Sequence, residues 1–171
     1  MARYTTSAVS QTAILAGMNA TTTVNGWIGY LGAGASAGFR LRRVTVGVRA
    51  GASVPTSQQV TIELHRQTVA PAGTGLATVA TGQAQETWVP TDPTAGLIFS
   101  SATTIGTTGP TVTATPMHTI TFNTQSTLDY PVEFTDELIC NAGTANGIAF
   151  VNIGNTLPAA HFYVITVCWE V

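Results

Sequence analysis

The sequence predicts an all-β protein, and three observations lead to that prediction. Threonine is the commonest polar residue, and it accompanies many valines and isoleucines, which also favour extended chain. No stretch of about 10 to 12 residues keeps an apolar helical period without a glycine, a proline or a run of threonines. Turn-forming residues separate short alternating segments throughout the chain.

Two segments give the clearest strands. The chain alternates over Phe39–Ala50 (FRLRRVTVGVRA) and again over residues 59–66 (QVTIELHR). Further strands are expected at residues 76–80, 87–89, 97–100, 111–115, 118–122, 130–134, 138–140, 148–153 and 161–171. About eight to ten short strands without crossover helices predict a two-sheet antiparallel β-sandwich. A jelly roll is the preferred topology, and an immunoglobulin-like sandwich is the alternative.

The first long strand contains a conflict of phase. Leu41 shares a face with Arg43, whereas Val44 shares the opposite face with Arg42. A β-bulge near Arg42 and Arg43 would bring the apolar residues onto one side. The alternative is a buried arginine that pairs with Glu63 on the next strand.

The last strand, residues 161–171, is largely apolar on both faces. His161, Tyr163, Ile165, Val167, Trp169 and Val171 line one side, and Phe162, Val164 and Cys168 lie on the other. We therefore expect this strand in the centre of a sheet or at a contact with another subunit.

The N-terminal segment differs in kind from the rest of the chain. Residues 1–20 have no evident partner and are expected to form an arm or extended segment, with residues 1–12 reaching another subunit. Residues 21–171 are expected to form one sandwich domain, in which residues 21–31 supply a first strand. The length of 171 residues fits that single domain.

Only 8% of the residues are charged, whereas 44% are hydrophobic, and the mean hydropathy is +0.27. This composition excludes a disordered tail. The six basic residues are all arginines, and the formal net charge is -2, which argues against a nucleic-acid partner. No apolar run reaches the roughly 18 residues of a membrane span, so no membrane partner is expected.

Few residues could carry chemistry, and we expect neither catalysis nor a cofactor. Glu63 and His65 share one strand face, but His118 and His161 stand alone, so no metal site is expected. Cys140 and Cys168 lack metal-ligand spacing and are expected to be buried free thiols. Period-two threonines at 111, 113, 115, 119 and 121 are interpreted as a polar strand surface that replaces charge.

Two parts of the chain carry a resemblance to a known class. The run FRLRRVTVGV at residues 39–48, and the run NAGTANGIAFVN at residues 141–152 followed by LPAAH at residues 157–161, resemble capsid-associated proteins of tailed bacteriophages. The similarity is to small β-sandwich decoration, or cement, proteins of phage heads. It covers about the C-terminal three quarters of the chain and rests on strand and turn patterns.

This resemblance implies a structural, non-enzymatic virion protein made in the host cytoplasm. It would bind the capsid exterior as a homotrimer, contact the major capsid protein and stabilise capsomer contacts. Candidate partner contacts are Arg3, Tyr4, Trp27, Tyr30, Arg42 and Trp169. One alternative is a carbohydrate- or receptor-binding tail or fibre head that uses Trp27, Tyr30, Trp88 or Tyr130 as stacking platforms. The other is a cupin-like metal enzyme, in which His65, His118 and His161 would converge.

Overall fold

The computed structural model confirms the predicted class, a sandwich of two antiparallel sheets in which no described residue is helical. It describes residues 3–9, 27–51, 53–69, 86–87, 98–101, 110–133, 137–154, 156–158 and 160–171. For residues 8, 9, 27, 30, 86–87 and 98–101, the backbone alone is described.

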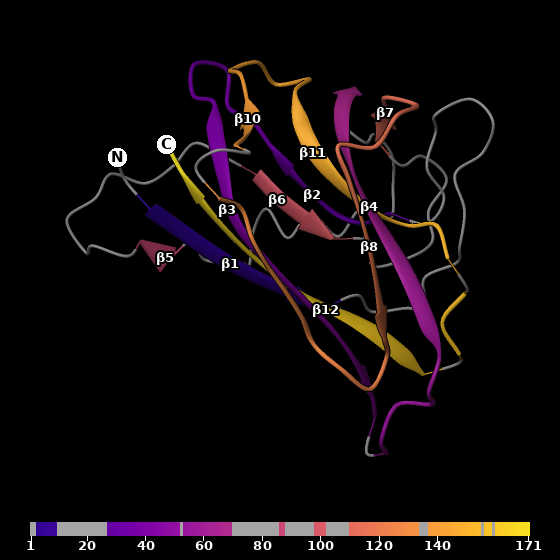
Figure 1. The fold of residues 1–171 in the computed structure, drawn as a ribbon. Helices are drawn as coiled ribbons and strands as arrows, with labels where there is room; N and C mark the ends of the chain where they lie inside the picture. Colours follow the sequence, from indigo (N-terminus) through magenta and orange to yellow (C-terminus); the bar gives the residue numbers. More distant parts are fainter. Residues whose placement is uncertain are drawn as a thin grey trace.

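Within the described ranges, each sheet has six strands. Figure 1 shows how they are arranged. Sheet I contains β1 (Arg3–Val9), β3 (Phe39–Ala50), β5 (Glu86–Thr87), β9 (Leu128–Pro131), β10 (Leu138–Cys140) and β12 (His161–Glu170). Sheet II contains β2 (Trp27–Gly32), β4 (Gln59–Val69), β6 (Ile98–Ser101), β7 (Thr111–Val112), β8 (His118–Asn123) and β11 (Gly147–Asn152).

The strand pairing is nested along the chain. Strand β1 pairs with β12, β2 with β11, β3 with β9 and β10, and β4 with β7 and β8. Two further pairings, β3 with β12 and β4 with β11, join these pairs into the two sheets. The chain therefore resembles one long hairpin whose two arms are rolled together.

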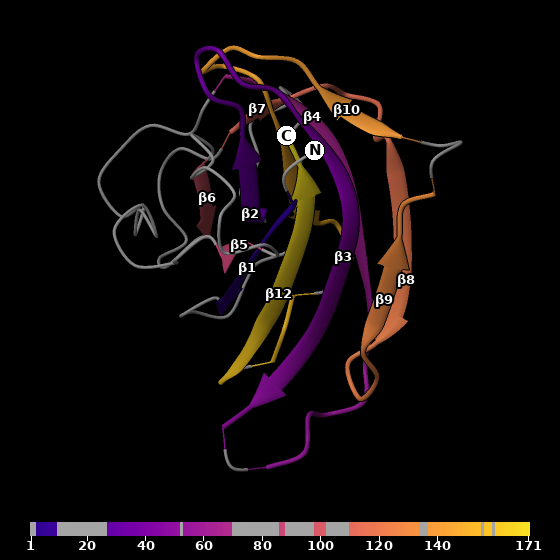
Figure 2. The same cartoon turned by 90° about the vertical axis from the view of Figure 1, so that its left-hand side faces the viewer.

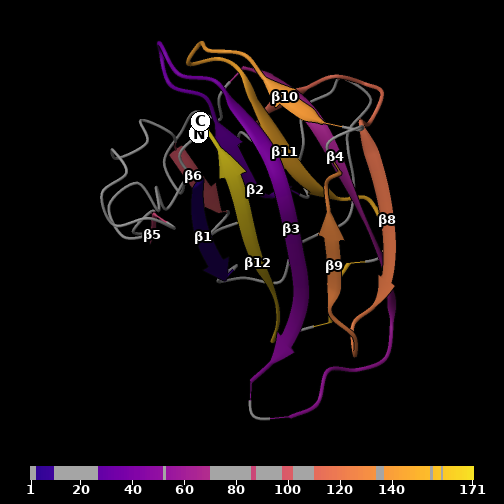
Figure 3. The same cartoon turned by 60° about the vertical axis from the view of Figure 1, so that its left-hand side comes forward.

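A hairpin closes one side of the sandwich. Strand β8 lies at the edge of sheet II beside β4, and β9 lies at the edge of sheet I beside β3. Figures 2 and 3 show β8 and β9 side by side at one edge of the sandwich. The rings of His118 and Tyr130 stack there at 4.2 Å between centroids. This contact fastens the two sheets along the closed side.

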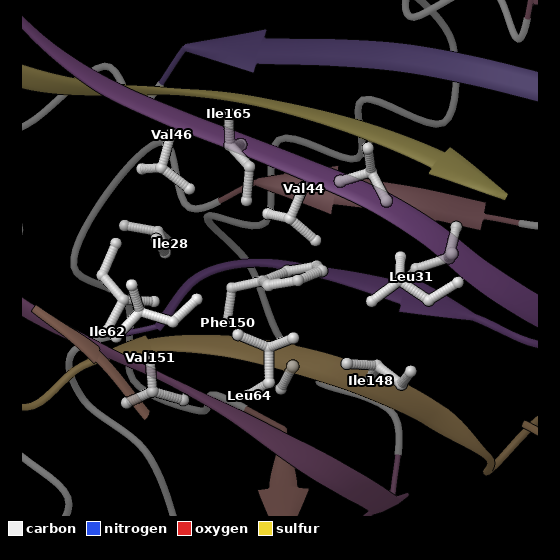
Figure 4. Close-up of a cluster of buried hydrophobic side chains, with 14 of the residues drawn as sticks. Ile28, Leu31, Val44, Val46, Ile62, Leu64, Ile148, Phe150, Val151 and Ile165 are labelled. Carbon is white, nitrogen blue, oxygen red and sulfur yellow. The ribbon is translucent and has the colours of Figure 1, made fainter. Parts of the chain in front are cut away.

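The core fills the space between the sheets (Figure 4). Val44 and Ile165 from sheet I pack toward Leu64 and Phe150 from sheet II, and each is at most 1% exposed. The alternation predicted for β4 is confirmed, since Val60, Ile62 and Leu64 all face this core. Burial of these side chains is the main contribution to folding stability.

The predicted bulge in β3 is confirmed and lies at Arg42. Cys168 pairs with Arg43, but the next residue, Trp169, pairs with Leu41, so Arg42 is the extra residue on β3. Leu41 and Val44 can then both point inward, although they are three positions apart. The alternative prediction, that a buried arginine pairs with Glu63, was wrong. Glu63 lies on sheet II and bonds to His65.

Strand β12 lies in the centre of its sheet, between β3 and β1, as one interpretation of its apolar faces predicted. Its inward residues from His161 to Trp169 are buried, and its outward residues from Phe162 to Cys168 are half-buried. The expected strand at residues 76–80 lies outside the described residues.

The predicted N-terminal arm contains a strand of the chain's own sandwich. Residues Arg3–Val9 pair with β12 along their whole length. Tyr4 is 1% exposed, and its ring stacks on that of Trp169 at 5.8 Å between centroids. The sandwich therefore includes a strand that precedes residue 21. Its partner could not be recognised locally, because it lies at the other end of the sequence.

We predict that Tyr4→Ala lowers the free energy of unfolding by about 3 kcal/mol, because the change opens a cavity beside Trp169. Urea denaturation measures this effect. Ser7→Ala on the outward side of β1 is the control and is expected to change stability by less than about 0.5 kcal/mol. An unchanged midpoint for Tyr4→Ala would show that β1 does not belong to the folded core.

Candidate functional site

The outer face of sheet I is the candidate site, and hydroxyl groups cover much of it. Adjacent strands place Ser7 beside Thr166, and the two hydroxyl oxygens lie 2.7 Å apart. The thiol of Cys168 donates to the Thr5 hydroxyl at 3.4 Å. These side chains satisfy one another across the strands, so the face is polar without carrying charge.

Apolar side chains share the middle of this face. Phe162 and Val164 alternate with Thr166 along β12, and all three are half-buried. A hollow of about 200 Å³ lies here and is lined by Thr45, Gly47, Val48, Thr127, Val164 and Thr166. The centre of the outer face is thus a shallow, uncharged depression.

One end of the same face carries a chain of ion pairs. The Glu170 carboxylate accepts from Arg3 Nε at 2.6 Å and from Arg42 Nε at 2.8 Å. Arg42 also reaches Glu137 with Nη1 at 2.9 Å, and Glu137 accepts from Arg40 Nη1 at 3.0 Å. Three arginines and two glutamates therefore alternate in one network at the ends of β1, β3 and β12.

Burial and hydrogen bonding shift the pKa values of Glu170 and Arg42 in opposite directions. Burial by itself would raise the pKa of Glu170, but the hydrogen bonds from Arg42 and Arg3 outweigh it and lower the pKa. For Arg42, burial would lower the pKa, but the bonds to Glu170 and Glu137 raise it. Both groups are therefore held in their charged forms, and their charges are neutralised inside the chain.

A second ion pair lies farther along the face, in solvent. The Arg43 guanidinium donates to both carboxylate oxygens of Asp129, one of them at 2.6 Å, and the Thr45 hydroxyl donates to the same carboxylate at 3.3 Å. These hydrogen bonds, led by those from Arg43, lower the pKa of Asp129. The pair is exposed, so solvent screens it.

The predicted partner-contact residues fall into three groups. Arg3 and Arg42 join in the network around Glu170. Tyr4 and Trp169 are buried against each other, so their rings already pack inside the chain. Trp27 and Tyr30 lie on β2 of the other sheet, and their side chains, like Trp88, lie outside the described residues.

The three histidines have separate partners in the structure. His65 lies between the Thr113 carbonyl at 2.8 Å and Glu63 at 2.7 Å, which confirms that Glu63 and His65 share a face. His118 stacks on Tyr130, and His161 Nε2 accepts from the Thr56 backbone N–H. Among the described residues, no three His, Cys, Asp or Glu side chains gather as metal ligands would.

Both cysteines are free, as the sequence predicted. Cys140 on β10 is buried, and burial raises the pKa of its thiol. Cys168 on the outer face of β12 is half-buried rather than fully buried. The two thiols therefore differ in access to solvent.

The threonine array predicted from the sequence lies on sheet II. It forms part of the polar outer surface of that sheet. Thr121 on β8 and Thr61 on β4 face each other with their hydroxyl oxygens 3.0 Å apart. Thr119 donates to Glu63 at 3.3 Å. These hydroxyl groups therefore bond across neighbouring strands of sheet II without adding charge to its surface.

Sequence reasoning missed Glu137 and Glu170 as partners of Arg42. The available signal was the Arg-x-Arg-Arg pattern, which requires acids nearby if the strand is central. It could not choose among the eight acidic residues of the chain without the strand pairing.

No protein-family model, no curated protein and no solved structure matches this chain. None of the described residues belongs to a helix with the length and apolar character to cross a membrane.

We predict that Glu170→Gln lowers the free energy of unfolding at pH 7 by about 2 kcal/mol, because two arginines lose their shared carboxylate. The pKa of Glu170 is lower in the folded chain, so its contribution is present above the ordinary carboxyl pKa and is lost as the pH falls through the folded-state value. Urea unfolding between pH 7 and pH 3 measures both effects.

Asp129→Asn is the matched control, because it removes an exposed carboxylate that also bonds to an arginine. Its effect on the unfolding midpoint is expected to be small. Equal losses in the two variants would contradict a special role for the network around Glu170.

We predict that a thiol reagent modifies Cys168 in the native protein and reaches Cys140 only on unfolding. Cys140 is buried with a raised pKa, so it offers little reactive thiolate. Mass spectrometry of the labelled protein identifies the modified residue, and Cys168→Ser is expected to abolish native labelling. Rapid modification of Cys140 in the folded chain would contradict this order.

Proposed function

We propose that this chain is a structural virion protein, a capsid decoration or cement protein that binds the outer surface of a phage head. The observation that carries the proposal is the outer face of sheet I. Its centre, around Val164 and Thr166, combines hydroxyl groups with half-buried apolar side chains. The charges at its end are already paired within the chain.

Another protein can cover such a face at low energetic cost. An unpaired charge loses several kcal/mol of hydration when it is buried, whereas a charge that already has a partner loses less. Hydroxyl groups can form hydrogen bonds with a partner, and the apolar groups contribute by leaving water. Low overall charge therefore fits a function performed by contact.

The strand order supports the jelly-roll form of the sandwich. Four nested antiparallel pairs, rolled so that β1, β12 and β3 lie opposite β2, β11 and β4, correspond to the double Greek key of that fold. The phage decoration proteins that the sequence resembles are commonly jelly rolls. The strand order therefore favours a jelly roll over the immunoglobulin-like topology. A jelly roll is also the topology that the capsid proposal expects.

The proposed partners are the major capsid protein and further copies of this chain, arranged as a homotrimer on the capsid exterior. A symmetric shell offers the same contact many times, so modest single contacts together hold the protein on the particle. The protein would act as a brace between capsomers, without catalysis and without a cofactor.

We predict that Val164→Glu reduces binding to capsids at least tenfold, because it places an unpaired charge in the centre of the outer face of sheet I. The test assembles shells from a major capsid protein encoded by the same genome, and the copies of this chain bound per shell are measured after sedimentation. Tenfold corresponds to about 1.4 kcal/mol, a modest desolvation cost for a buried charge.

Thr121→Glu on the exposed outer face of sheet II is the matched control and is expected to leave binding unchanged. Urea unfolding verifies that both variants are folded. Full occupancy by folded Val164→Glu would rule out this face as the contact surface. A genome that carries this gene without any capsid gene would contradict the capsid proposal itself.

A further inference from the structure

Arg49 differs from the other arginines of β3, because it forms no ion pair with any described acidic side chain. The other three arginines of the strand form the ion pairs described above. The guanidinium of Arg49 instead lies over the Phe162 ring, 5.6 Å from the ring centroid. Its hydrogen-bond donors are therefore not engaged by a carboxylate in the part of the chain that the structure describes.

The aromatic ring keeps this guanidinium on the outer face of sheet I. Arg49 and Phe162 lie opposite each other on β3 and β12, and both point outward. A cation over an aromatic face is attracted to the ring, and the contact restricts the long arginine side chain. A partner that binds this guanidinium therefore has less side-chain entropy to overcome.

The hollow of the outer face lies one outward pair away from Arg49. Gly47 pairs with Val164, and both residues line the hollow of about 200 Å³. A Cβ atom at Gly47 would have Thr127 as its one described neighbour within 4 Å, with the hydroxyl oxygen at 3.4 Å. The missing side chain thus leaves room beside Val164. Positions 47 and 49 are about 7 Å apart along the strand.

We propose that Arg49 and this hollow form one binding site for an extended protein segment with an aliphatic side chain and a carboxylate two positions apart. The aliphatic group would enter the hollow beside Val164, and the carboxylate would accept from Arg49. An extended segment repeats its side chains with the period of the strand beneath it, so both groups reach their sites together. That this segment belongs to the major capsid protein rests on the proposed function, whereas the chemistry of the site does not.

Charge complementarity selects an acidic partner for this end of the face. An apolar or uncharged partner that covered Arg49 would remove its hydration without supplying a counter-charge. A carboxylate compensates for that loss, because a guanidinium can donate two parallel charge-assisted hydrogen bonds to it. The arginines at the other end of the face already have this compensation within the chain.

The first test needs no capsid. A tripeptide of leucine, serine and aspartate, blocked at both ends, is titrated into the labelled protein and followed by NMR. We expect the Arg49 Nε–H and Val164 methyl signals to shift together. Replacing the aspartate by asparagine, or the leucine by glycine, is expected to weaken binding about fivefold.

Variants of the protein separate the two halves of the site. Arg49→Gln is expected to weaken peptide binding as much as loss of the aspartate does, and Gly47→Val to weaken it by filling the hollow. Gly47→Ala replaces the valine variant if that variant does not fold. Arg66→Gln is the matched control, because it removes the same charge from sheet II, where Arg66 donates to the Ile139 carbonyl. It is expected to bind the peptide as the wild type does.

The second test repeats the shell-binding measurement, in which Arg49→Gln is expected to lower occupancy at least about tenfold and Arg66→Gln to leave it unchanged. Peptide binding that is absent, or that ignores Arg49 or the leucine, would overturn the proposal. Undiminished shell binding by folded Arg49→Gln would also overturn it and leave the proposed function standing. Peptide binding that depends on Arg49, in a protein that binds no shells, would support the site and contradict the capsid function.

Discussion

The pairing of β12 with β3 and β1 is the interaction on which the rest of the structure depends. It brings the last strand of the chain into the centre of sheet I, where Arg3 bonds to Glu170 across a sequence separation of 167. Nested pairing of this kind requires both ends of the chain before the sheet is complete. Such non-local topologies fold slowly, because the loops must close before the contacts stabilise them.

The arrangement of the chain's few charged side chains depends on the same strand pairing. The bulge at Arg42 allows Leu41 and Val44 both to face the core and leaves the Arg42 side chain within reach of Glu137 and Glu170. Without the extra residue, the apolar side chains of one half of β3 would point to the outer face. The bulge thus lets the apolar side chains of β3 face the core while Arg42 joins the ion network. It also leaves the centre of the outer face uncharged.

Local patterns were sufficient for much of the fold. Alternation in β3 and β4, the apolar faces of β12 and the conflict of phase at Arg42 all led to correct expectations, because each depends on the two-residue period of a strand. The strand at Arg3–Val9 was not recognised as part of the sandwich. Its tyrosine, threonines and serine give little apolar alternation, and its partner lies at the far end of the chain. The partners of Arg42 were missed for the same reason.

The sequence by itself determined the class of the protein: a β-sandwich with little charge, two free cysteines and a core of alternating valines, isoleucines and leucines. These properties follow from composition and from the period of single strands, which need no knowledge of distant residues. Only the tertiary structure decided which strands pair, that Tyr4 stacks on Trp169, that Glu170 neutralises two arginines and that His161 binds the Thr56 amide. Each of these contacts joins residues far apart in the chain, so its geometry exists only after the two sheets have formed.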